Sequence, residues 1–126
     1  MMARLEHVNV TVADPDQTAQ LLCDLFGWHV RWAGPGMTSG RTVHVGETDS
    51  YVALFSYGDV ADSREESYRT KGALNHIAVV VDDLDATEAR VKAAGLVPEN
   101  HADYEPGRRF YFREANGVEV EVVSYA

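Results

Sequence analysis

Two histidines and two glutamates are the residues of this chain whose types and spacing suggest chemistry. His7 and His76 belong to two similar stretches, LEHVNVTVADPDQT (5–18) and LNHIAVVVDDLDAT (74–87), which share seven of fourteen residues at a shift of 69 positions. Glu119 and Glu121 lie in a valine-rich run near the other end of the chain. Imidazole nitrogens and a carboxylate together form a common ligand set for divalent metals. The two histidines and at least one of these carboxylates therefore form a candidate metal site, provided that the fold brings them together.

An isolated histidine at the head of a strand has a simpler explanation. It is more often a core residue whose ring is satisfied by a hydrogen bond than a metal ligand. That alternative applies to His76 alone, and it is weakened because His7 occupies the matching place in the first copy. A second match, of YVALFSY (51–57) with EVEVVSY (119–125) at a shift of 68, extends the repeat. The expected organisation is one domain, residues 1–126, with module one at about 1–57, a linker at about 58–73 and module two at about 74–126.

Each module reads as a strand, a helix and three further strands. Val8, Val10 and Val12 alternate with polar residues, which is typical of a strand with one buried face. Asp14 predicts the start of a helix and Gly27 predicts its end. Further strands of module one are expected at 28–32, 41–45 and 51–57, with a turn at 33–40. Module two should contain a helix near 84–94, between Asp83 and Gly95, and strands at 96–101, 108–113 and 118–125.

Strand periodicity also assigns faces to the candidate residues. Successive side chains of a strand point to opposite sides, so the histidines and the neighbouring valines face in opposite directions. If the valines pack on the helices, His7, His76 and Glu121 all lie on the faces away from the helices. Other residues expected on these faces are candidates for substrate contact: Asn9, Thr11, Tyr51 and Phe55 in module one, and Arg109 and Tyr111 in module two. Arg109 could hold an anionic group, and a solvated strand edge is the simpler alternative for it.

The whole pattern resembles the vicinal oxygen chelate superfamily, which includes glyoxalase, extradiol dioxygenases, fosfomycin-resistance thiol transferases and bleomycin-resistance proteins. The stretches that carry the resemblance are LEHVNVTVADPDQTAQLLCDLFGW, LNHIAVVVDDLDATEARVKAAG and RRFYFREANGVEVEVVSY, so it covers essentially the whole chain. It implies an α+β fold of two βαββ modules, whose eight strands form an incomplete barrel around a metal or a ligand. Members commonly dimerise, so a homodimer is expected.

The resemblance also implies roles for the candidate residues. It makes His7, His76 and Glu121 the ligands of one divalent ion (Zn, Mn, Ni, Co or Fe(II)), with Glu121 also acting in catalysis. The fourth ligand position of glyoxalase-like members falls on Ala53, which has no donor atom, so we expect open room for a substrate there. This favours ring-cleaving oxygenation, or another reaction of a chelated substrate, over glyoxalase activity.

The resemblance therefore favours a metal-dependent enzyme that acts on a small oxygen-chelating substrate, with dioxygenase-, lyase- or transferase-like chemistry. Two alternatives stay open. One is a metal-free binding module that sequesters a small molecule, as bleomycin-resistance proteins do. The other is a degenerate structural subunit.

Composition excludes some functions and leaves others. The 126 residues are 45% hydrophobic, which suffices for one compact core. Eleven Lys and Arg against 20 Asp and Glu give a net charge of −9, which argues against a nucleic-acid partner. No apolar run approaches the roughly 20 residues of a membrane span, and no signal peptide is evident. With Cys23 as the single cysteine, a cytoplasmic location is expected. The polar linker at 58–73 is expected to be a passive surface segment, with a lid over a cavity as the alternative.

Overall fold

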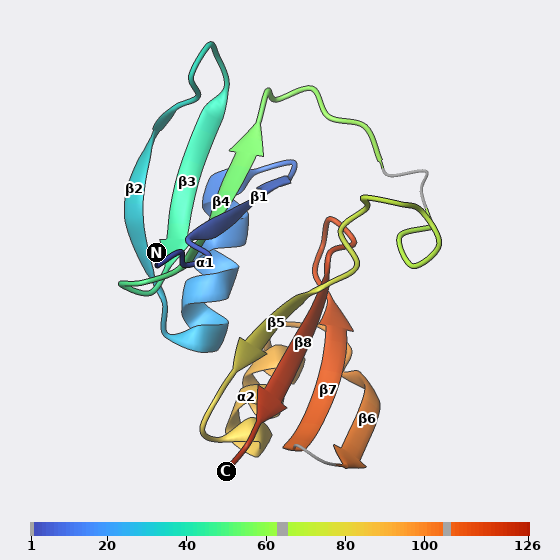
Figure 1. Cartoon of the computed structure of the whole chain (residues 1–126). Coiled ribbons are helices and arrows are strands. Elements are labelled where there is room, and N and C mark those ends of the chain that lie inside the picture. The colour runs from blue at the N-terminus through green and yellow to red at the C-terminus, as the bar shows by residue number, and fades with distance from the viewer. Residues whose placement is uncertain (1, 63–65, 105–106) are drawn as a thin grey trace. The chain divides into compact units, whose positions relative to one another are not determined.

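The computed structural model describes residues 2–62, 66–104 and 107–126 of the chain. The chain divides into two compact units, residues 1–61 and 62–126, which we call module one and module two (Figure 1). The elements of module one are β1 (His7–Thr11), α1 (Pro15–Phe26), β2 (His29–Pro35), β3 (Arg41–Gly46) and β4 (Tyr51–Ser56). Those of module two are β5 (Ile77–Val80), α2 (Leu84–Ala93), β6 (Glu99–Tyr104), β7 (Gly107–Arg113) and β8 (Glu119–Ser124).

The two modules have the same topology. The strand order is β1-β4-β3-β2 in module one and β5-β8-β7-β6 in module two, so the first strand of each module pairs with the last. That pairing is parallel in both modules, and the other strand pairs are antiparallel. The predicted α+β fold, built from a duplicated module with one helix and four strands, is confirmed.

The ends of α1 follow from its sequence. The side chain of Asp14 accepts a hydrogen bond from the Gln17 backbone N–H, which has no partner within the helix. At the other end Gly27 has a φ of +70°, a left-handed conformation that glycine adopts without strain. Its N–H donates to the carbonyl of Cys23 at 2.9 Å. Both predicted ends of this helix are therefore confirmed.

The core of module one lies between α1 and its sheet. Val10, Val12 and Leu54 are at most 9% exposed, as are Val43 and Val45 on β3. Full burial of each such side chain stabilises a fold by roughly 1.5–3 kcal/mol. The predicted valine face is therefore the core face, which leaves the histidine side of the sheet available for other roles.

Module two buries the equivalent face against α2. Its core contains Val79, Val91, Phe110 and Phe112, of which the two phenylalanines are fully buried. Asp83 caps α2 by accepting a hydrogen bond from the Ala86 N–H at 3.0 Å. The predicted core face and helix start are confirmed in this module too.

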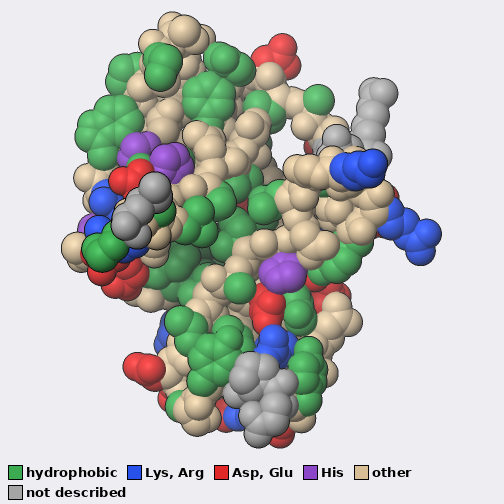
Figure 2. All heavy atoms as spheres, in the orientation of Figure 1, with side chains coloured by type: hydrophobic (Ala, Val, Ile, Leu, Met, Phe, Trp, Pro, Cys, Tyr) green, Lys and Arg blue, Asp and Glu red, His purple; other side chains and the backbone are tan. Residues whose placement is uncertain are grey.

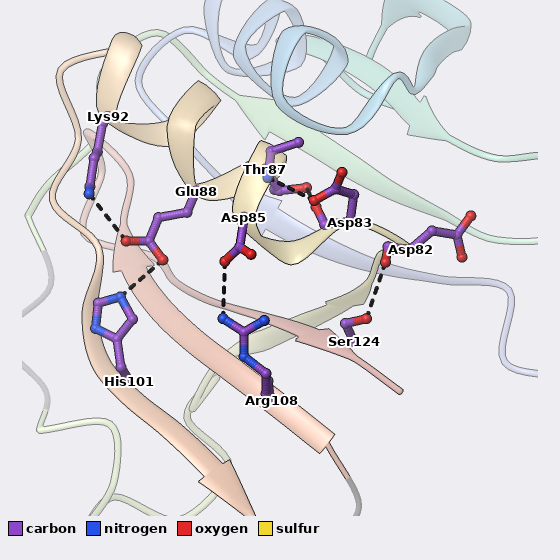
Figure 3. Close-up of polar contacts among 10 residues, drawn as sticks. Asp82, Asp83, Asp85, Thr87, Glu88, Lys92, His101, Arg108 and Ser124 are labelled. Atoms are coloured by element: carbon purple, nitrogen blue, oxygen red, sulfur yellow. Dashed lines mark hydrogen bonds and ion pairs between the residues drawn. The ribbon is translucent and has the colours of Figure 1, made fainter. Parts of the chain in front are cut away.

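Polar side chains fasten α2 to the neighbouring strands (Figure 3). Asp85 binds Arg108 of β7 at 3.0 Å. Glu88 binds His101 of β6 at 3.1 Å and Lys92 of α2 at 3.3 Å. Burial by itself would raise the pKa of Glu88, but the hydrogen bonds from His101 and Lys92 outweigh it and lower that pKa. These contacts give His101 a structural partner.

Two strands, β2 and β6, differ from their predicted ranges by more than one residue. β2 continues to Pro35, into the expected turn, because β2 is an edge strand, where glycine and proline are tolerated. β6 begins at Glu99 rather than at 96. The N–H of Leu96 donates to the carbonyl of Val91, so this residue still belongs to the end of α2. His101 consequently lies within β6 rather than at the end of the predicted strand.

Candidate metal and ligand site

The two candidate ligands of module two lie together, as predicted. Nε2 of His76 is 3.0 Å from Oε1 of Glu121. The pairing of β5 with β8 explains this, because Ala78 is in register with Glu121 and His76 directly precedes β5. Glu121 has a side chain only 9% exposed, whereas that of His76 is 29% exposed. A buried carboxylate thus faces an imidazole that solvent can reach.

The other ring nitrogen of His76 has its own partner. Nδ1 lies 2.6 Å from Oδ1 of Asn75. An amide oxygen only accepts hydrogen bonds, so Nδ1 carries a proton in this contact. Nε2 then faces an oxygen of Glu121, which also only accepts hydrogen bonds, so this side of the ring is suited to a cation shared with the carboxylate. This arrangement is how metal-binding histidines are usually oriented, with the far nitrogen donating to a protein oxygen.

Arg109 holds the second oxygen of the Glu121 carboxylate. Its Nη1 is 2.8 Å from Oε2, and the Arg109 side chain is 12% exposed. The guanidinium also lies 4.9 Å from the ring centre of Tyr104. Substrate contact by Arg109 stays a prediction. In the structure its guanidinium donates to the carboxylate of Glu121 and, at 3.5 Å, to the carbonyl of Gly107, so its evident effect is to fix the orientation of that carboxylate.

Tyr111 borders the same pair. Its ring meets the His76 ring edge-on, with centres 5.7 Å apart. Burial raises the pKa of the Tyr111 hydroxyl, and the nearby Glu121 raises it further. Its expected role in substrate binding stays a prediction, on a residue that the structure places beside both candidate ligands.

His7 lies in module one and is oriented in the same way as His76. Its Nδ1 is 2.9 Å from Oε1 of Glu6, which also accepts a hydrogen bond from the Tyr51 hydroxyl at 3.2 Å. In each module the residue directly before the histidine therefore binds Nδ1. Glu6 and Asn75 were not identified from the sequence, although they occupy equivalent positions of the repeat.

The chemistry of these donors fits a divalent metal ion. Among the described residues, no group of three His, Cys, Asp or Glu side chains lies close enough together to hold a metal ion. Module two supplies one imidazole and one carboxylate, 3.0 Å apart, with their remaining polar atoms already bound. Module one supplies a second imidazole with its Nδ1 bound.

The predicted substrate face of module one is present. The pairing of β1 with β4 sets His7 beside Tyr51, Asn9 beside Ala53, and Thr11 beside Phe55. Substrate binding by Asn9, Thr11, Tyr51 and Phe55 stays a prediction. Ala53, however, is 1% exposed, so the open room expected beside it is filled. One neighbour in register with it on the same face is His44 of β3.

His44 of β3 lies on the same face of module one as His7 and Asn9. Its ring stacks on Tyr51, with centres 4.6 Å apart. Burial lowers the pKa of His44, and the nearby His7 and Arg31 lower it further. It is therefore a neutral imidazole on the same face as His7 at neutral pH.

Glu119 is the second carboxylate on the face of Glu121. It is buried, 6% exposed, and accepts a hydrogen bond from the Tyr68 hydroxyl at 2.8 Å, while Arg113 lies 3.7 Å away. Tyr68 belongs to the segment expected to be a passive linker. That expectation is wrong at Tyr68, which attaches the segment to β8.

Comparison with known proteins settles the family. The family model of the Glyoxalase/Bleomycin resistance protein/Dioxygenase superfamily matches residues 4–122. The chain belongs to this superfamily. The resemblance seen in the sequence is therefore confirmed, and with it the expected fold class. No curated protein matches the chain.

Solved structures of this superfamily share the fold. A glyoxylase/bleomycin resistance protein/dioxygenase domain from Frankia sp. EAN1pec has a TM-score of 0.81 at 21% identity, over 98% of this chain and 93% of that chain. The fosfomycin resistance protein FosX from Listeria monocytogenes, in complex with Mn(II) and sulfate, has a TM-score of 0.73 at 22% identity, over 98% and 93%. FosX from Mesorhizobium loti has a TM-score of 0.74 at 25% identity, over 98% and 92%.

In the described part of the chain, neither helix has the length and apolarity of a membrane span.

Proposed function

We propose that this protein is a divalent-metal-dependent enzyme of the superfamily, acting on a small substrate with adjacent oxygen atoms. The observation that supports this proposal is the contact between His76 and Glu121, in which each side chain is fixed by a further partner. Preorganised ligands lose little conformational freedom when an ion binds. Manganese is the first ion to test, since the FosX structure from Listeria contains it.

His7, His76 and Glu121 would hold the ion. His7 enters as the third ligand because it repeats the position of His76 and has the same Nδ1 contact to the preceding residue. A bound ion would act as a Lewis acid toward the substrate oxygens. The chain itself contributes orientation: Glu6 and Asn75 bind the Nδ1 atoms of His7 and His76, so Nε2 would be the coordinating atom, and Arg109 holds Glu121. Zinc, nickel, cobalt and Fe(II) are the other candidate ions.

A second candidate function is metal-free sequestration of a small molecule. It is favoured by the completeness of the polar network in module two. Both nitrogens of His76 and both oxygens of Glu121 have protein partners, so no ion is needed to satisfy them. A degenerate structural subunit would use neither the ion nor a ligand.

The metal content of the untagged protein, purified without added metal, distinguishes these functions. Elemental mass spectrometry should find about one divalent ion per chain if the enzyme proposal is correct. His101→Ala is a matched control, because His101 also lies in module two but pairs with Glu88. Protein without stoichiometric metal, before and after incubation with Mn, Zn, Ni, Co and Fe(II), would leave sequestration as the better account.

We further propose that the protein is a cytoplasmic homodimer. Each sheet has two edge strands, and unpaired edges of this kind are commonly covered by another chain. Light scattering at micromolar concentration should give twice the mass of 13.9 kDa. A monomer under these conditions would contradict the assembly without affecting the metal proposal.

A further inference from the structure

A row of four rings, one from each strand, crosses the histidine face of module one. His7 of β1 stacks on Tyr51 of β4, with ring centres 4.8 Å apart. Tyr51 contacts His44 of β3 at 4.6 Å, and His44 contacts Trp32 of β2 at 5.2 Å. Histidine and hydrophobic side chains lie together on this surface of the molecule (Figure 2). The row of rings crosses the whole sheet and begins at a proposed metal ligand.

A β-bulge aims a cation at the same face. Val30 pairs with Val45 and Trp32 with His44, so Arg31 is an extra residue in β2. Two successive residues then oppose one, and the usual alternation of side chains is broken. As a result Trp32 contacts the His44 ring while the Arg31 guanidinium lies 4.4 Å from the centre of the Tyr51 ring. Bulges often redirect a side chain in this way beside a functional site.

The indole of Trp32 and the guanidinium of Arg31 can both contact a ligand. Trp32 is 49% exposed, and its indole lies over Gly34, where an added Cβ would come within 2.8 Å of it. Because Gly34 has no side chain, the Trp32 indole can lie across the strand at this position. Arg31 forms no salt bridge with a described residue, so its N–H donors stay available beside the ring face. It also lines a cavity of about 280 Å³ with Arg4, Glu6, Thr48 and Asp49. The Glu6 carboxylate of this cavity is already bound by His7 and by the Tyr51 hydroxyl.

We propose that Trp32 and Arg31 form a subsite for a flat aromatic carboxylate, whose ring stacks on the indole and whose carboxylate binds the guanidinium. This inference rests on the proposed function, because it names the class of small molecule on which the proposed enzyme acts. A flat ring gains stacking energy that a saturated ring of the same charge does not. A planar guanidinium matches the two oxygens of a carboxylate.

Nuclear magnetic resonance of the chelator-treated full chain tests this subsite. The chain has two tryptophans, Trp28 and Trp32, and therefore two indole N–H signals. Titration with 2-naphthoate should shift the Trp32 signal, and cyclohexanecarboxylate should bind at least about threefold more weakly. Trp32→Leu should weaken naphthoate binding about threefold to tenfold. Arg31→Met should weaken it about twofold to fivefold.

Two control variants, and the use of chelator-treated protein, separate naphthoate binding at this subsite from metal binding. Trp28→Phe removes an indole that packs on Phe26, and Lys71→Met removes a charge from module two; both should leave naphthoate binding unchanged. Equal affinities for the two carboxylates, no shift of the Trp32 signal, or unaltered binding by Trp32→Leu and Arg31→Met would overturn the inference. Naphthoate binding by a chain that takes up no metal would support the subsite and contradict the enzyme. Metal binding without naphthoate binding would support the enzyme proposal and contradict the subsite.

Discussion

His76 and Glu121 are 45 residues apart in the chain, yet Nε2 of the first lies 3.0 Å from Oε1 of the second. The parallel pairing of β5 with β8 creates this contact, and Asn75 and Arg109 fix its two sides. A carboxylate and an imidazole at this separation can share a proton or a divalent cation. The orientation of each donor is therefore built into module two before any ion arrives.

The residues that bind Nδ1 should control metal affinity. Asn75→Ala removes the acceptor that orients His76, and Glu6→Ala does the same for His7. Each variant should weaken the binding of Mn(II) about 10- to 100-fold in calorimetric titrations, as loss of such outer partners usually does. Asn75→Asp, which keeps an acceptor oxygen, should restore most of the affinity. Glu47→Gln is the control for the charge lost in Glu6→Ala. Unchanged Mn(II) affinity in Asn75→Ala would contradict the role of Asn75 in orienting His76.

Arg109 should matter far more to stability than the residue next to it. Arg109→Met leaves the buried carboxylate of Glu121 without its cation and should cost about 2–4 kcal/mol of unfolding free energy. Arg108→Met breaks a pair whose side chains are 51% and 77% exposed, and should cost about 0.5 kcal/mol or less. Urea unfolding of the two variants measures both values. Equal losses would show that the Arg109–Glu121 pair is no more than a surface contact.

The contact between Tyr68 and Glu119 predicts a pH dependence. The hydrogen bond to Glu119 and partial burial raise the pKa of Tyr68 to about 12. A phenol whose pKa is raised on folding stabilises the fold fully below its unfolded pKa of about 10, and this stabilisation is lost as the pH rises toward 12. A tyrosinate absorbance titration of the protein, minus that of Tyr68→Phe, should show this late ionisation. Glu119→Gln should move it toward pH 10, and a difference titration centred near 10 in the unaltered protein would contradict the contact.

Much of this fold follows from local patterns in the sequence. Alternating valines predict which face of each sheet packs on a helix, and Asp14 and Gly27 predict the ends of α1, because these signals depend on a few neighbouring residues. The repeat places His76 and Glu121 on one face of a module. Their contact in the structure agrees with that placement.

The features that the sequence did not predict depend on pairing and distant contacts. The extra residue at Arg31 is a property of the register between β2 and β3, which alternation alone does not specify. The Tyr68–Glu119 hydrogen bond joins residues 51 positions apart, one of them in a segment without periodicity. Glu6 and Asn75 were missed because neither lies within the predicted strand pattern. Ala53 was expected to border open space, but packing of its neighbours fills that space.

The central claim is the proposal that His7, His76 and Glu121 hold one divalent ion. Calorimetric titration of the chelator-treated chain with Mn(II) tests it most directly, on the unaltered protein, His7→Ala, His76→Ala and the control His101→Ala. We predict about one ion per chain for the unaltered protein and the control, with an affinity at least about tenfold lower in each of the other two variants. Stoichiometric binding that survives both His7→Ala and His76→Ala, or no binding by the unaltered chain, would contradict the claim.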